Sequence, residues 1–132
     1  MSKVCFASAK LKELRAEASL PAKFLRMLDG YPLKDMFDGK TVAIKMHLGG
    51  NLGYTTISPL FVKLLVGKVK DAGGRPFITD GTYSIPGAKD RGYTEDVLGA
   101  PLVPAAGLNE KYFVNVPIGY KSLKEAELCG GR

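Results

Sequence analysis

The strongest constraint on the fold is a strand, a helix and a second strand that follow one another between residues 41 and 80. Residues 41–46 (TVAIKM) are apolar and β-branched, as expected of a central strand. Ser58 caps a helix that leads into a second apolar strand at 75–80 (RPFITD). A helix of this length suits a crossover between parallel strands. The sequence therefore predicts an α/β fold with a small, mostly parallel sheet, in two or three layers.

The rest of the chain carries weaker patterns. The expected elements are a strand at 3–8, two helical pieces within 11–28, a helical turn at 32–37, a short helix at 94–98, an edge or irregular strand at 113–120 and a capped helix at 122–128. The helix after Ser58 should bury Leu60, Phe61, Leu64, Leu65 and Val69. Such a small sheet leaves a face uncovered, so we expect a truncated chain, a missing C-terminal half or a homo-oligomer that covers it.

Size and composition predict one soluble domain over residues 1–132. The chain is 45% hydrophobic and 24% charged, which is typical of a globular domain with its own core. Lysines and glutamates interrupt the first twenty residues, so no secretory signal is expected there. The longest apolar runs are far below the roughly 20 residues that cross a bilayer. We therefore expect a cytoplasmic protein without a membrane partner.

The cysteine content and the net charge limit which cofactors and partners this chain is expected to have. Cys5 and Cys129 are the only cysteines and His47 the only histidine, so this chain by itself is expected to hold neither an iron–sulfur cluster nor a zinc site. The net charge of +6 favours anionic partners. Basic residues are interleaved with acidic ones and no basic run alternates with aromatic residues, which disfavours nucleic acid.

A candidate site follows from the predicted parallel strands, because their carboxyl ends meet at one edge of the sheet. Ligands of open α/β sheets bind outside that edge. A glycine-rich loop follows the first strand there, and a second polar loop follows the next strand. The residues expected to line the crevice are His47, Gly49, Gly50, Asn51, Thr55, Thr56, Asp80 and Thr82. Glycines let backbone N–H groups approach an anion closely, so a phosphate or carboxylate would fit, with Lys45 directed toward it.

Each of these residues has an alternative role. His47 suits a general acid or base with Asp80 as its orienting partner, or it is a hydrogen-bonded structural imidazole. Asp80 equally suits a turn with the residues after it, and Lys45 equally extends to solvent. The loop matches neither the dinucleotide fingerprint nor the P-loop, so its glycines can serve conformation alone.

Three segments resemble a known family. VAIKMHLGG and NLGYTT (within 42–56), FVKLLVGKVKDAGGRPFITDGTYS (61–84) and GYTEDVLGAPLVPAAGL (92–108) are similar to the domain of unknown function 362 family, whose members are uncharacterised iron–sulfur-centre proteins. The resemblance implies that this chain is the N-terminal portion of a longer architecture that carries a [4Fe–4S] cluster elsewhere. By position, the polar motifs of the family fall on Lys45, His47, Gly49, Asn51, Thr55 and Asp80.

The leading functional hypothesis is a domain that binds a small anionic metabolite or nucleotide within an iron–sulfur-associated redox protein. One alternative is an enzyme in its own right, with His47 as acid or base. The other is an interaction or oligomerisation module. Neither substrate nor reaction follows from these residues.

Overall fold

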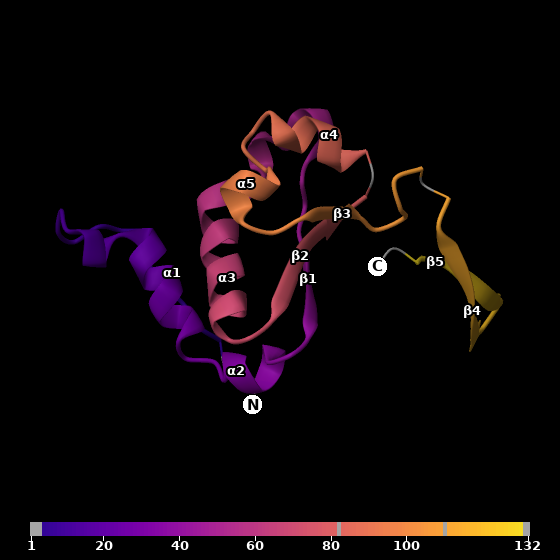
Figure 1. Cartoon of the computed structure of the whole chain (residues 1–132), viewed down its shortest axis with the longest axis horizontal. Coiled ribbons are helices and arrows are strands. Elements are labelled where there is room, and N and C mark those ends of the chain that lie inside the picture. The colour runs from indigo at the N-terminus through magenta and orange to yellow at the C-terminus, as the bar shows by residue number, and fades with distance from the viewer. Residues whose placement is uncertain (1–3, 82, 110, 131–132) are drawn as a thin grey trace.

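The computed structural model describes residues 4–81, 83–109 and 111–130 (Figure 1). Its helices and strands, in chain order, are η1 (Ala16–Ala18), α1 (Leu20–Leu28), α2 (Leu33–Phe37), β1 (Thr41–Lys45), η2 (Gly50–Thr55), α3 (Pro59–Asp71), β2 (Arg75–Asp80), α4 (Ser84–Lys89), α5 (Glu95–Leu98), β3 (Leu102–Pro104), β4 (Phe113–Tyr120) and β5 (Leu123–Cys129). The elements η1 and η2 are 3₁₀ helices. Within the described ranges, no helix is long and apolar enough to cross a membrane.

A three-stranded parallel sheet forms the centre of the fold. Its strand order is β1-β2-β3, and both strand pairs are parallel. Ile44 lies opposite Ile78, and Ile78 lies opposite Leu102, so these three residues share one face. The α/β class and the parallel strand-helix-strand unit predicted from residues 41–80 are confirmed.

Helix α3 covers that face with a different stripe from the predicted one. The hydroxyl of Ser58 accepts a hydrogen bond from Leu60 N–H at 3.4 Å, as predicted for the cap, and Pro59 occupies the first turn. The buried residues are Val62, Val66 and Val69, of which only Val69 belongs to the predicted stripe. The prediction was wrong for the other four residues, because Leu60 is 47% exposed and Phe61, Leu64 and Leu65 are only partly buried.

Helix α1 explains this rotation of the α3 face. It packs beside α3 (Figure 1), and the rings of Phe24 and Phe61 meet edge to face with centroids 5.5 Å apart. Phe61 therefore faces a neighbouring helix, and the smaller Val62 and Val66 pack in the core cluster with Ile78 of the sheet. Helix α1, capped by Ser19, is the second of the two expected helical pieces, whereas the first is reduced to η1.

The C-terminal part forms a hairpin where a helix was predicted. Strand β5 pairs antiparallel with β4, with Val116 opposite Ala126 and an irregularity between Pro117 and Tyr120. The predicted helix at 122–128 is therefore wrong, because pairing with β4 outweighs the helix preference of its Lys, Glu, Ala and Leu residues. The irregular strand at 113–120 is confirmed.

The N-terminal strand predicted at 3–8 is also wrong. Residues 4–8 belong to neither sheet, and Lys3 lies outside the described residues. The segment runs as a coil, and the ammonium of Lys23 holds it by donating to the carbonyl oxygens of Ser8 at 2.8 Å and Lys10 at 2.9 Å. A strand needs a partner for its backbone groups, and β1 pairs with β2 only.

Candidate functional site

Lys45, His47 and Asp80 come together where β1 and β2 end. The ammonium Nζ of Lys45 lies 3.0 Å from Asp80 Oδ1, and His47 Nδ1 lies 3.9 Å from Asp80 Oδ2. The parallel register that pairs Lys45 with Thr79 brings the carboxyl ends of both strands to this point. The Asp80 side chain is 11% exposed, whereas those of Lys45 and His47 are 64% and 71% exposed. The site is therefore a buried carboxylate flanked by two nitrogen-bearing side chains that extend into solvent.

The carboxylate of Asp80 is held ionised by its donors. Burial disfavours the charged form and alone would raise the pKa of Asp80, but the backbone N–H of Leu48, the ammonium of Lys45 and the N–H of Gly81 together lower it below its usual value. The Leu48 N–H donates to Oδ2 at 2.7 Å. Asp80 therefore fixes the start of the glycine-rich loop and the position of the Lys45 ammonium at once.

Arg91 holds the glycine-rich loop from one side, a role that sequence reasoning missed. Its Nη1 donates to the carbonyl oxygens of Gly50 at 3.0 Å and Gly87 at 2.7 Å, and its Nη2 donates to that of Leu48. The contacts with Gly50 and Leu48 span more than forty residues, and nothing in the local pattern around Arg91 predicts them. The guanidinium therefore places a fixed positive charge against the loop that joins β1 to α3.

The three glycines of this loop play different parts. Gly49 has a φ of 78°, and a Cβ there would lie 2.5 Å from Gly53 Cα, so this position demands glycine for both reasons. A Cβ on Gly53 would lie 2.0 Å from the guanidinium carbon of Arg91. Gly50 has open space around it and a φ of 44°. Gly49 and Gly53 therefore serve close packing, whereas a Cβ on Gly50 would meet no neighbouring atom within 4 Å.

The remaining predicted site residues divide into two groups. The hydroxyl of Thr56 donates to the Gly53 carbonyl at 2.6 Å and so closes the loop, while Thr55 is exposed at the end of η2. For Asn51 the structure describes the backbone, which lies in η2, and Thr82 lies outside the described residues.

Tyr93 is a further residue that sequence reasoning missed. Its side chain is buried, and its hydroxyl donates to the Ile57 carbonyl just before α3 begins. This contact anchors the far end of the loop, so Asp80, Arg91 and Tyr93 between them hold the loop at its start, middle and end. A tyrosine in a polar segment carries no local signal for such a role.

Metal ligands do not converge in the described part of the chain. No three of its His, Cys, Asp and Glu residues lie close enough together to hold a metal ion. Cys5 and Cys129 are both free thiols on exposed positions. An iron–sulfur cluster is held by about four cysteine thiolates, so these residues do not fit one.

Fold and site define the class: a small α/β domain with a polar cluster outside the carboxyl ends of parallel strands. Its sequence matches, over residues 42–131, the family described as Domain of unknown function (DUF362). The chain belongs to this family, as its three motifs suggested. Comparison with curated proteins and with solved structures gave no match.

Proposed function

We propose that this chain binds a small anionic metabolite or nucleotide at Lys45 and His47. The supporting observation is the Lys45 ammonium, which Asp80 holds in place while most of the side chain stays in solvent. Two of its three donor hydrogens have partners among the described residues, Asp80 Oδ1 and the Met46 carbonyl at 3.1 Å. The third is available to a ligand oxygen.

Local charge supports an anion over a cation. The negative charge of Asp80 is matched by Lys45, and Arg91 adds a positive charge against the loop. Charge-assisted hydrogen bonds from such donors are about twice as strong as neutral ones. The exposed imidazole of His47 adds a further donor beside Asp80.

A thermal-shift titration tests this proposal with inorganic phosphate, ATP and citrate as probes. A ligand that binds the folded state alone stabilises it by about 2.7 kcal/mol at one hundred times its Kd. We expect a saturable rise in Tm that Lys45→Met removes and the matched control Lys63→Met, an exposed lysine on α3, retains. Equal shifts in both variants, or none in the parent chain, would contradict it.

The enzymatic alternative has less support from the geometry. Asp80 Oδ2 already accepts from Leu48 N–H, and the 3.9 Å to His47 Nδ1 is beyond hydrogen-bond reach. A His47→Ala variant that kept ligand affinity and lost turnover would favour an enzyme over a binding domain.

One observation favours the interaction module as a second function. The hairpin β4–β5 stands apart from the helices and the parallel sheet (Figure 1), and almost all of its residues are exposed. Sedimentation velocity over a range of concentrations tests it: association with no ligand affinity favours the module.

The iron–sulfur association of the family is a proposal about the longer architecture. In that arrangement this chain supplies the anion site and the cluster is carried by other residues. Iron analysis and the visible spectrum of the protein purified from its native source would test the association.

A further inference from the structure

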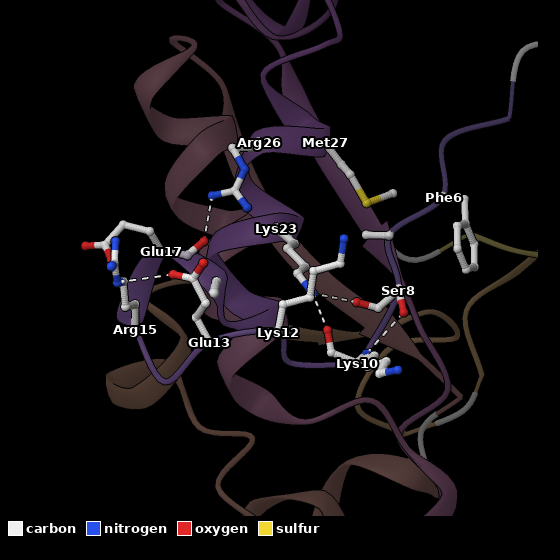
Figure 2. Close-up of a pocket in the computed structure, with 12 residues that line it drawn as sticks. Phe6, Ser8, Lys10, Lys12, Glu13, Arg15, Glu17, Lys23, Arg26 and Met27 are labelled. Atoms are coloured by element: carbon white, nitrogen blue, oxygen red, sulfur yellow. Dashed lines mark hydrogen bonds and ion pairs between the residues drawn. The ribbon is translucent and has the colours of Figure 1, made fainter.

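A polar pocket of about 940 Å³ lies between the N-terminal coil and α1 (Figure 2). Charged side chains make up most of its lining: five are basic and two are acidic, which leaves an excess of three positive charges. The basic residues are Lys10, Lys12, Arg15, Lys23 and Arg26, and the acidic ones are Glu13 and Glu17. All the lining residues precede residue 42, where the match to the family begins. The pocket therefore belongs to a part of the chain that the family match does not cover.

Two cations of α1 hold the coil in place through its backbone. Lys23 and Arg26 lie about one turn apart on the helix, so they share a face. The Lys23 ammonium donates to the carbonyl oxygens of Ser8 at 2.8 Å and Lys10 at 2.9 Å. The Arg26 guanidinium donates to the carbonyl oxygen of Glu17 at 2.9 Å, and Figure 2 shows all three contacts. The pocket is thus formed before any partner binds, and neither cation is neutralised by a carboxylate.

Most of the positive charge of the pocket has no acidic partner within the described ranges. Arg15 Nε lies 3.2 Å from Glu13 Oε2, and this is the one ion pair among the lining residues. The ammonium groups of Lys10 and Lys12 are exposed and have neither a hydrogen-bond nor an ion-pair partner in the described part of the chain. With the two cations of α1, four positive charges are opposed by the single carboxylate of Glu17. The pocket therefore attracts anions.

The positive groups are spread along the pocket and do not converge on one point. In Figure 2 the Arg15 guanidinium and the Lys10 ammonium lie on opposite sides of the pocket, with Lys23 between them. A single phosphate or carboxylate is bound best by donors that converge on it. Separated donors suit a ligand whose negative charges are themselves spaced, as the side chains of an acidic peptide are. The apolar part of the lining includes Phe6, which is 86% exposed and can contact a peptide between its charges.

We propose that this pocket binds an acidic segment of a partner protein, whose carboxylates pair with Lys10, Lys12 and the two cations of α1. The inference goes beyond the proposed function, because none of the lining residues belongs to the anion site at Lys45. Exposed ion pairs are individually weak, so the affinity comes from several of them acting together. The interaction is therefore strongly dependent on salt.

Fluorescence anisotropy of a fluorescein-labelled hexaglutamate peptide, titrated with the whole chain at low ionic strength, tests the inference. We expect saturable binding, and none for a hexaglutamine peptide of the same length. The Debye length falls from about 10 Å at 0.1 M salt to about 3 Å at 1 M, so binding should be lost in 1 M NaCl.

Two double variants with the same change in charge locate the interaction. Lys10→Gln/Lys12→Gln removes two exposed ammonium groups that have no partner in the described structure, and it should weaken hexaglutamate binding about tenfold. The matched control Lys121→Gln/Lys124→Gln removes two exposed ammonium groups from the hairpin and should change the affinity by less than about twofold. Lys45→Met should also retain the binding, because its ammonium is paired with Asp80 outside this pocket.

Three results would overturn the inference. An equal loss in the two double variants would show that the net charge of the chain, and not this pocket, attracts the peptide. If tripolyphosphate displaces the labelled peptide at a far lower concentration than unlabelled hexaglutamate does, the pocket is a site for a compact polyanion and the acidic segment is wrong. No binding of hexaglutamate to the parent chain at low salt would reject the pocket as a docking site.

Discussion

The parallel sheet and the C-terminal hairpin show two different ways in which one chain makes β structure. In the sheet, Ile78 is 0% exposed and lies between Ile44 and Leu102, under the valines of α3. In the hairpin, Ile118 is 44% exposed, and the only strand residues that are half-buried are Val116 and Ala126, which lie opposite each other. The sheet is thus stabilised by burial, whereas the hairpin depends on its own backbone pairing.

The stability of the molecule therefore lies in the sheet and its helices. An isolated two-stranded hairpin is marginally stable at best in water. The base of this one is attached through Tyr112, whose backbone N–H donates to the Ala106 carbonyl at 3.0 Å and whose carbonyl accepts from Gly130 N–H at 2.9 Å. The candidate site, in contrast, is built on two strands of the sheet, so its geometry follows the stability of the sheet.

The largest expected effect compares the same substitution in the two regions. Ile78→Ala removes a fully buried side chain and should lower the free energy of unfolding by about 2–5 kcal/mol. Ile118→Ala should change it by less than about 0.5 kcal/mol, because the side chain is largely exposed. Urea denaturation followed by circular dichroism checks both. A loss of similar size at Ile118 would show that the hairpin and the sheet unfold as one unit.

The same contrast explains how much of the fold could be predicted from the sequence. Residues 41–80 were predicted well because capping by Ser58, the first-turn proline and two apolar runs all indicate the same local structure. Residues 122–128 were not, because their helix-forming composition is overridden by pairing with β4, a contact that no local pattern encodes. Local signals therefore predicted the part that carries the site.

The site residues likewise divide into those that sequence patterns predicted and those that they missed. Lys45, His47 and Asp80 were predicted to converge because parallel strands end at one edge, and they do. Arg91 was missed because it reaches the loop from a turn after α4, through carbonyl oxygens that every residue carries. The loop glycines were expected to approach an anion, but Gly49 and Gly53 serve packing within the loop and against Arg91.

A smaller change in the free energy of unfolding is expected when the negative charge of Asp80 is removed. Asp80→Asn keeps an acceptor for Leu48 N–H and removes the ionic pairing with Lys45, so at pH 7 it should lower the free energy of unfolding by about 1–2 kcal/mol. The control Glu125→Gln, on an exposed hairpin position, should leave it unchanged. Urea denaturation of both variants beside the parent chain measures the difference, and an equal loss in the two would contradict the assignment.

The pH dependence of that difference follows from the lowered pKa of Asp80. Since the carboxyl group binds its proton more weakly in the folded state, its stabilising contribution is complete above the ordinary Asp pKa and is lost as the pH falls through the lower folded value. The parent chain and Asp80→Asn should therefore converge in stability at low pH. Urea midpoints measured between pH 7 and pH 2, in steps of about one unit, check this. A constant difference over that range would show that the ionised form contributes nothing.

The smallest effect is a gain in stability, and it tests the independence of the hairpin most directly. Gly67 lies within α3, and a Cβ added there would meet no neighbouring atom within 4 Å, so Gly67→Ala should raise the free energy of unfolding of the sheet region by about 0.5–1 kcal/mol. Gly119 also has open space but a φ of 61°, so Gly119→Ala strains the hairpin alone. Hydrogen exchange of α3 amides should slow in the first variant and stay unchanged in the second. Faster exchange in α3 of Gly119→Ala would mean that the hairpin supports the sheet after all.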